Sequence, residues 1–128
     1  MTTNQEVSVR NVVGKAIVEE VRDVAIRSVR NSLRGEWRDE ASRKLQAVLE
    51  KLEPEQKRAV NRLCVDIIDT VLHDLLFMIE SHEEFDVSVR MESRLTSIRP
   101  GPCDLQGALF GDAGWIAKFS KEKRSSFG

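Results

Sequence analysis

Residues 54–82 read PEQKRAVNRLCVDIIDTVLHDLLFMIESH, and this stretch decides the fold. Its apolar residues recur every three or four positions, which places them on one half of a helix surface. They are Val60, Cys64, Val65, Ile67, Ile68, Val71, Leu72, Leu75, Leu76, Met78 and Ile79. Pro54 suits the first turn of such a helix, where its missing N–H leaves no hydrogen bond unmade. We therefore predict a long central helix that packs this wide apolar face against the core.

Two further helices are expected before the central one. The first covers residues 15–33 and ends at Gly35, since glycine commonly terminates helices. The second covers residues 36–52 and ends before Pro54, because the residue before a proline disfavours helical backbone. The short connections favour antiparallel neighbours. Residues 6–13 fit either a short strand or the start of the first helix.

After the central helix the apolar period changes from 3.6 to 2. Residues 85–92 alternate apolar and polar side chains, which predicts a strand. A single strand leaves backbone groups unpaired and needs a partner. The candidates are residues 6–13, 94–99, 115–119, or the same strand of another copy, and we favour a hairpin with 94–99.

The C-terminal part of the chain is predicted to form a small cap on the helices. A Pro-Gly-Pro turn at 100–102 precedes a short helical segment near 105–110, and Trp115, Ile116 and Phe119 follow as an apolar group. The expected fold class is mostly α (α+β). It comprises an antiparallel bundle of about three helices, a small β element near 85–92 and this C-terminal cap.

The length of 128 residues fits one domain. We predict a single helical domain over residues 1–120 and a disordered polar tail over residues 121–128, KEKRSSFG. The two cysteines, Cys64 and Cys103, and two histidines have no zinc-binding spacing. We expect no disulfide between the cysteines, because we expect a cytoplasmic protein.

The charge balance limits the possible partners. Lys and Arg number 20 and Asp and Glu number 21, so the net charge is −1. This argues against a strongly basic nucleic-acid-binding protein, and the absence of tyrosine weakens any base-stacking surface. No apolar run approaches the ~18 residues of a membrane span. We expect neither nucleic acid nor a membrane as a partner.

The central helix also carries the candidate functional residues, on its polar side. They are Arg62, Asp66, Asp69, His73 and Phe77. The simplest explanation is a solvated face with salt bridges. Phe77 among charges suggests instead a surface that binds another protein. The alternative is a metal or acid–base site made by Asp66, Asp69 and His73, whose spacing places two carboxylates and an imidazole on one side of the helix.

No known catalytic or cofactor-binding motif occurs in the sequence. We therefore expect a non-enzymatic protein without a cofactor that binds another protein in the bacterial cytoplasm, as an adaptor, a regulator or a toxin-neutralising partner does. Self-association into a homodimer is a further expectation. The alternative function is a small metal-binding protein or metal-dependent enzyme that uses the polar side of the central helix.

Overall fold

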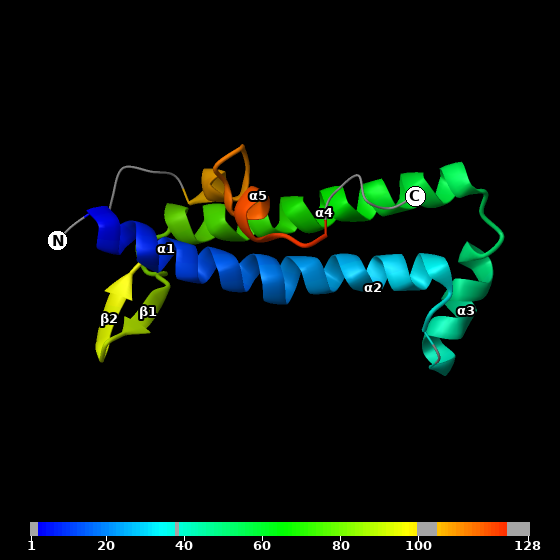
Figure 1. Cartoon of the computed structure of the whole chain (residues 1–128), viewed down its shortest axis with the longest axis horizontal. Coiled ribbons are helices and arrows are strands. Elements are labelled where there is room, and N and C mark those ends of the chain that lie inside the picture. The colour runs from blue at the N-terminus through cyan, green and yellow to red at the C-terminus, as the bar shows by residue number, and fades with distance from the viewer. Residues whose placement is uncertain (1–2, 38, 100–104, 123–128) are drawn as a thin grey trace.

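In this computed structural model, which describes residues 3–37, 39–99 and 105–122, two long helical segments lie side by side and antiparallel (Figure 1). The first consists of α1 (Thr3–Ile17), a π-helical turn (Val18–Arg22) and α2 (Asp23–Arg34), which follow one another without a break. The second is α4 (Pro54–Ser81). The predicted central helix is confirmed, and residues 6–13 lie in a helix, not in a strand.

Local sequence signals set the ends of these helices. Gly35 follows α2 with a φ of 71°, a left-handed conformation that suits glycine, and Glu36 N–H donates to Asn31 O at 2.9 Å. At the start of α4, Glu53 N–H donates to the Gln56 side chain at 2.8 Å. The stop at Gly35 is therefore confirmed.

The third helix, α3 (Glu40–Leu49), is shorter than predicted and projects from one end of the long pair (Figure 1). Asp39 caps it by accepting a hydrogen bond from Ser42 N–H at 3.0 Å. The hydrogen bonds from Ser42 lower the pKa of the Asp39 carboxyl group. The mostly helical fold with a small β element is confirmed, whereas the arrangement as a three-helix bundle is not.

The β element is an antiparallel hairpin of β1 (Ser88–Met91) and β2 (Arg94–Ser97), joined by Glu92 and Ser93. Both turn residues have positive φ, of 50° and 68°, as tight hairpin turns with the twist of the strands require. The predicted hairpin is confirmed. Arg99 connects it to α4 by donating hydrogen bonds to the carbonyl oxygens of Ile79 and His82.

The C-terminal segment covers one face of the long pair (Figure 1). It contains a 3-10 turn (Gln106–Leu109) on α4 and α5 (Trp115–Phe119) on α1. It adds its own side chains to a core that is continuous across the long helices and the hairpin. This core consists of Val9, Val18, Leu72, Leu76, Ile98, Leu105, Leu109 and Trp115. The predicted cap therefore packs through Trp115, while most of the predicted tail, residues 123–128, lies outside the described residues.

Trp115 packs directly on the backbone of α1 at Gly14. A Cβ atom at Gly14 would overlap the indole ring, so only glycine allows this contact. We expect Gly14→Ala to destabilise the fold by about 1–3 kcal/mol, the usual cost of overpacking a core. Urea unfolding measures this change, and a red shift of tryptophan emission should report the displaced indole. The neighbouring exposed substitution Lys15→Ala should leave both unchanged, and equal effects of the two would contradict the assignment.

Candidate functional site

The five side chains selected from the sequence all lie on α4 but at different depths. Arg62 and Phe77 are exposed, Asp66 and His73 are half-buried, and Asp69 is 4 % exposed. Asp69 is therefore out of reach of solvent, whereas the other four side chains are at least partly exposed.

The C-terminal segment covers part of this polar side of α4. The ring of Phe110 lies against His73, with 6.0 Å between the ring centroids. About two turns further along, Glu80 accepts a hydrogen bond from Leu105 N–H at 2.7 Å. His73 Nδ1 also lies 3.2 Å from Asp74 Oδ1. Contacts with Phe110 and Asp74 of the same chain therefore account for the partial burial of His73.

Asp69 has a structural partner, the fully buried Arg22 of the π-helical turn. Arg22 Nε donates to Asp69 Oδ1 at 2.6 Å, and Nη2 lies 3.4 Å from Oδ2. The pair joins the two long helical segments across 47 positions of sequence. Buried charges require this kind of pairing, because an isolated charge loses its hydration without compensation.

Arg22 also holds the C-terminal segment through a group that we call the clasp: Arg22, Asp23, Asp69, Ser120 and Glu122. Arg22 Nη1 donates to Ser120 Oγ at 2.9 Å and to the Glu122 carbonyl at 3.2 Å. Ser120 Oγ donates to Asp23 Oδ1 at 2.8 Å. The clasp therefore connects three segments that are far apart in the sequence.

A second arginine extends the clasp along α2. Arg30 Nη1 donates to Glu122 Oε2 at 2.8 Å, and its Nε donates to Asn61 Oδ1 of α4 at 3.1 Å. Lys121 N–H donates to Asp23 Oδ2 at 2.7 Å. Two residues of the predicted tail, Lys121 and Glu122, thus contact α2.

The geometry does not favour the metal alternative. Asp69 points to Arg22, while His73 contacts Asp74 and Phe110. Within the described parts of the chain, no three His, Cys, Asp or Glu side chains come together as a metal site. Asp66, Asp69 and His73 share one side of α4 without converging on a common point.

The clasp gives a prediction for Asp69. Asp69→Ala should destabilise the protein by about 3–5 kcal/mol, because it leaves the buried Arg22 guanidinium without its main counterion. Chemical denaturation measures this. Asp74→Ala is the matched control, since the Asp74 side chain is 71 % exposed and should change stability little. A loss below 1 kcal/mol for Asp69→Ala would contradict the role of the pair.

The most unusual feature of α4 lies on its other side. Five apolar residues form a row at intervals of three or four positions, and all are exposed: Leu63 (59 %), Ile67 (52 %), Val71 (59 %), Leu75 (46 %) and Met78 (40 %). We call these five residues the outer row. Ile67, Val71, Leu75 and Met78 were predicted as part of the core face, and that prediction is wrong.

The outer row faces away from the C-terminal segment. The C-terminal segment contacts His73 and Glu80. Val71 lies two positions before His73, and Met78 lies two positions before Glu80. Two positions on an α-helix correspond to a rotation of about 200°. On the neighbouring helix, Val21 is 52 % exposed and lies two positions before Asp23, which also contacts the C-terminal segment. Both long helical segments therefore carry exposed apolar side chains close in sequence to residues that the C-terminal segment contacts.

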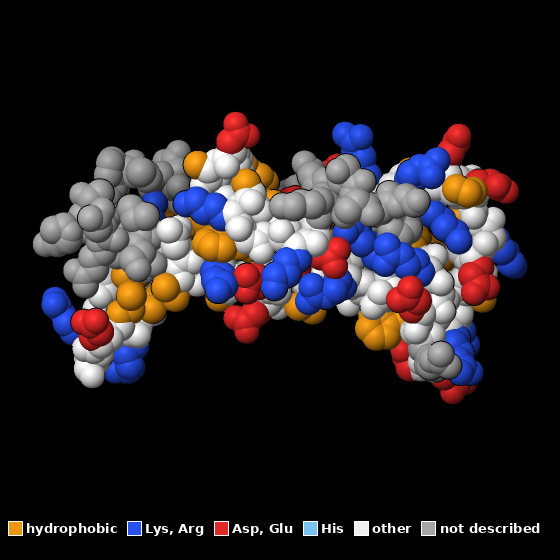
Figure 2. Space-filling view, viewed as in Figure 1, with side chains coloured by type: hydrophobic (Ala, Val, Ile, Leu, Met, Phe, Trp, Pro, Cys, Tyr) orange, Lys and Arg blue, Asp and Glu red, His pale blue; other side chains and the backbone are white. Residues whose placement is uncertain are grey.

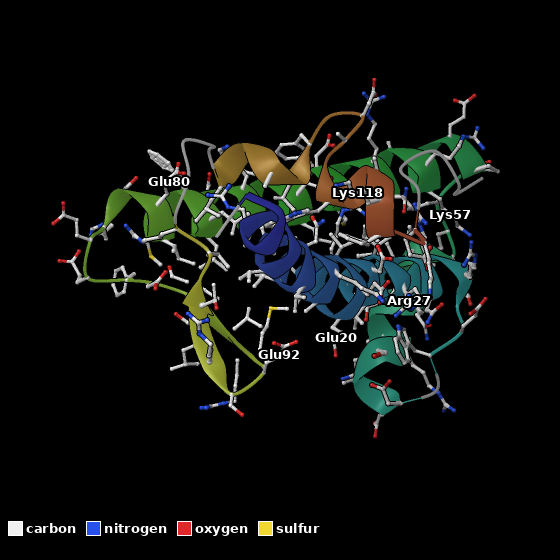
Figure 3. All side chains as sticks on the ribbon, turned by 60° about the vertical axis from the view of Figure 1, so that its left-hand side comes forward. Glu20, Arg27, Lys57, Glu80, Glu92 and Lys118 are labelled. Atoms are coloured by element: carbon white, nitrogen blue, oxygen red, sulfur yellow. The ribbon has the colours of Figure 1, made fainter. Side chains whose placement is uncertain are left out.

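Charge is distributed unevenly along the molecule. The end formed by the last turns of α2 and the first turns of α4 carries many Lys and Arg side chains, with Asp and Glu side chains among them (Figure 2). Arg27 and Lys57 lie towards this end, whereas Glu80 lies at the opposite end of α4 (Figure 3). The sequence from Leu63 to Val89 contains acidic residues but no Lys or Arg.

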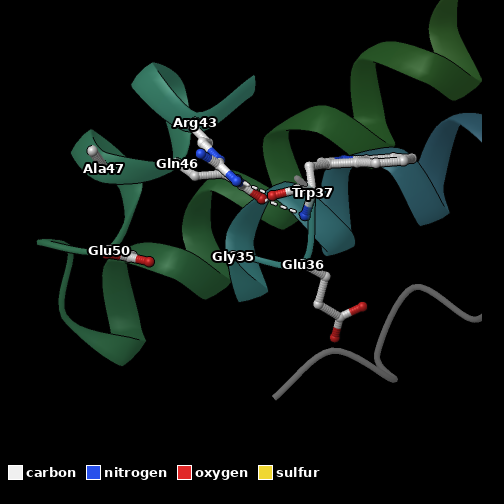
Figure 4. Close-up of a pocket in the computed structure, with 7 residues that line it drawn as sticks. All are labelled: Gly35, Glu36, Trp37, Arg43, Gln46, Ala47 and Glu50. Carbon is white, nitrogen blue, oxygen red and sulfur yellow. Dashed lines mark hydrogen bonds between the residues drawn. The ribbon is translucent and has the colours of Figure 1, made fainter. Parts of the chain in front are cut away.

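A pocket of about 510 Å³ lies between α3 and the loop after α2 (Figure 4). Within it, the Gln46 side chain accepts a hydrogen bond from Trp37 N–H at 2.7 Å and donates one to Trp37 O at 2.8 Å. Gln46 therefore holds the loop against α3. This arrangement explains its burial without a ligand.

Comparison with known proteins gives no functional assignment. No family model matches the chain, and no curated protein or solved structure is significantly similar to it. Among the described residues, no helix has the length and apolar character needed to cross a membrane.

Proposed function

We propose that this chain is a non-enzymatic cytoplasmic protein that acts by binding another protein, and that the outer row of α4 is the binding surface. The observation that carries the proposal is the exposure of five apolar side chains in one row: Leu63, Ile67, Val71, Leu75 and Met78. Adaptors, regulators and toxin-neutralising proteins are the classes in which such a surface would be used.

The size of the surface supports the proposal. The row presents on the order of 500 Å² of apolar surface, near the upper end for the largest patch of a typical monomer. Water contact with this area is unfavourable by ~25 cal/mol per Å². A partner that covers it would remove this cost, and polar residues around it would form the rim of the interface.

The polar side of α4 remains a second candidate surface. Arg62 and Phe77 are exposed there, and Phe77 is 43 % exposed. Asp69 is less suited to contact a partner, because the clasp buries it. The two surfaces lie on different sides of one helix, so single substitutions separate them.

We expect Val71→Asp to weaken partner binding by more than 10-fold, since a carboxylate in the centre of an apolar interface loses its hydration without a counterion. The fold should remain intact, because Val71 is already 59 % exposed. The measurement is quantitative co-purification with tagged protein from its native cells, followed by titration of the purified partner. Circular dichroism and thermal unfolding check the fold.

Two controls make this experiment specific. Val48→Asp introduces the same change at a 61 % exposed valine of α3 and should leave binding unchanged. Phe77→Asp tests the polar side of α4. Loss of binding with Phe77→Asp but not with Val71→Asp would place the interface on the polar side and reject the outer row.

A further inference from the structure

The shape of the outer row raises the question of which protein covers it. Leu63, Ile67, Val71 and Leu75 are spaced by four residues, so they form one of the oblique ridges of a helix surface. Ridges of this kind pack into the grooves beside the same ridge of another helix, at a crossing angle of about 50°. A ridge of this kind can therefore pack beside the same ridge of a second copy.

The distribution of charge along α4 distinguishes between orientations. After Glu55, the basic residues Lys57, Arg58 and Arg62 all lie in the first turns of the helix, whereas the rest of α4 carries only acidic charges. Antiparallel copies of α4 would bring the basic end of each copy towards the acidic end of the other. Parallel copies would bring like charges together, which is unfavourable.

The neighbouring helix reinforces this polarity. Because α2 is antiparallel to α4, its last turns lie at the basic end of α4, where Arg27 and Lys57 are found (Figure 3). The last turn of α4 itself has no basic residue, although basic side chains are favoured there by the helix dipole. The first turns of α4 and the last turns of α2 therefore form one end rich in basic residues, which the antiparallel arrangement places towards the acidic end of the other α4.

From this combination we propose that a second copy of this chain covers the outer row, in a symmetric antiparallel dimer whose two-fold axis passes near Val71. This inference rests on the proposed function, since it names the partner of the same surface. The apolar residues of the outer row form the centre of this interface. The apolar area of on the order of 500 Å², together with its polar rim, approaches the ~800 Å² per partner of a standard interface. In a two-fold symmetric dimer the same surface of each copy is buried in the interface.

The first test is the mass of the full chain in solution across a range of concentrations. Sedimentation equilibrium should give twice the chain mass of 14.5 kDa at ~100 µM protein. Val71→Asp should raise the dimer dissociation constant by more than 10-fold, whereas Val48→Asp should leave it unchanged. A wild-type chain that stays monomeric at this concentration, or a dimer unaffected by Val71→Asp, would overturn the inference.

The same variants separate this inference from the proposed function. A monomeric wild type that still binds a different protein, and loses it with Val71→Asp, rejects the dimer and leaves the protein-binding surface in place. If Val71→Asp weakens neither self-association nor the binding of any other protein, both the dimer and the proposed function are rejected.

Cysteine cross-linking tests the orientation. In a background with Cys64→Ser and Cys103→Ser, one chain carries Ile67→Cys and the other carries Leu75→Cys. A short bis-maleimide should link the mixed pair more efficiently than either variant with itself, because the antiparallel arrangement places residue 67 near residue 75 of the other copy. More efficient linking within each single variant would overturn the antiparallel arrangement. Val71→Cys, near the axis, should link to itself.

Discussion

The ion pair between Arg22 and Asp69 determines how α4 is rotated within this structure. Both side chains are buried, and the carboxylate accepts hydrogen bonds from Nε and Nη2 of the guanidinium. Once Asp69 points inward, the period of the helix directs Val65, Leu72 and Leu76 inward with it. The same rotation directs Ile67, Val71 and Leu75 outward. A polar contact thus decides which half of a wide apolar surface becomes the core and which half stays exposed.

The π-helical turn provides the other half of this contact. A regular α-helix points adjacent residues about 100° apart, yet Arg22 and Asp23 are both buried, with exposures of 0 % and 1 %. The wider turn inserts one extra residue and allows both to reach the C-terminal segment and α4. As a result Ser120 and Glu122 have fixed partners, and α5 is held over one face of the long pair. The opposite face of the pair has no such cover from the described segments.

Much of the fold could be predicted from local sequence signals. Pro54, Gly35 and the alternation before Ser93 mark features that depend on neighbouring residues alone, and all three were placed correctly. The burial of Asp69 could not be predicted, because its partner is 47 positions away and a mid-helix aspartate normally faces water. The π-helical turn was missed for a related reason, since it is stabilised by contacts with distant segments.

The error about the outer row follows from the same limit. Valine and leucine have the same pattern whether they face their own core or a partner, so periodicity alone assigned both stripes of α4 to the interior. The polar candidates were selected because charged residues are easily recognised in a sequence. The outer row could be recognised only after the clasp had fixed the rotation of α4.

An exposed row of this kind also constrains what the rest of the molecule can be. The fold does not need apolar side chains at Ile67 and Val71, because polar residues at 52–59 % exposure would satisfy water and leave the core unchanged. About half of each of these residues stays in contact with water, and apolar surface left exposed in this way increases the tendency to associate. An exposed row of this kind, on a helix whose Lys and Arg residues are confined to its first turns, supports the proposal that another protein covers it.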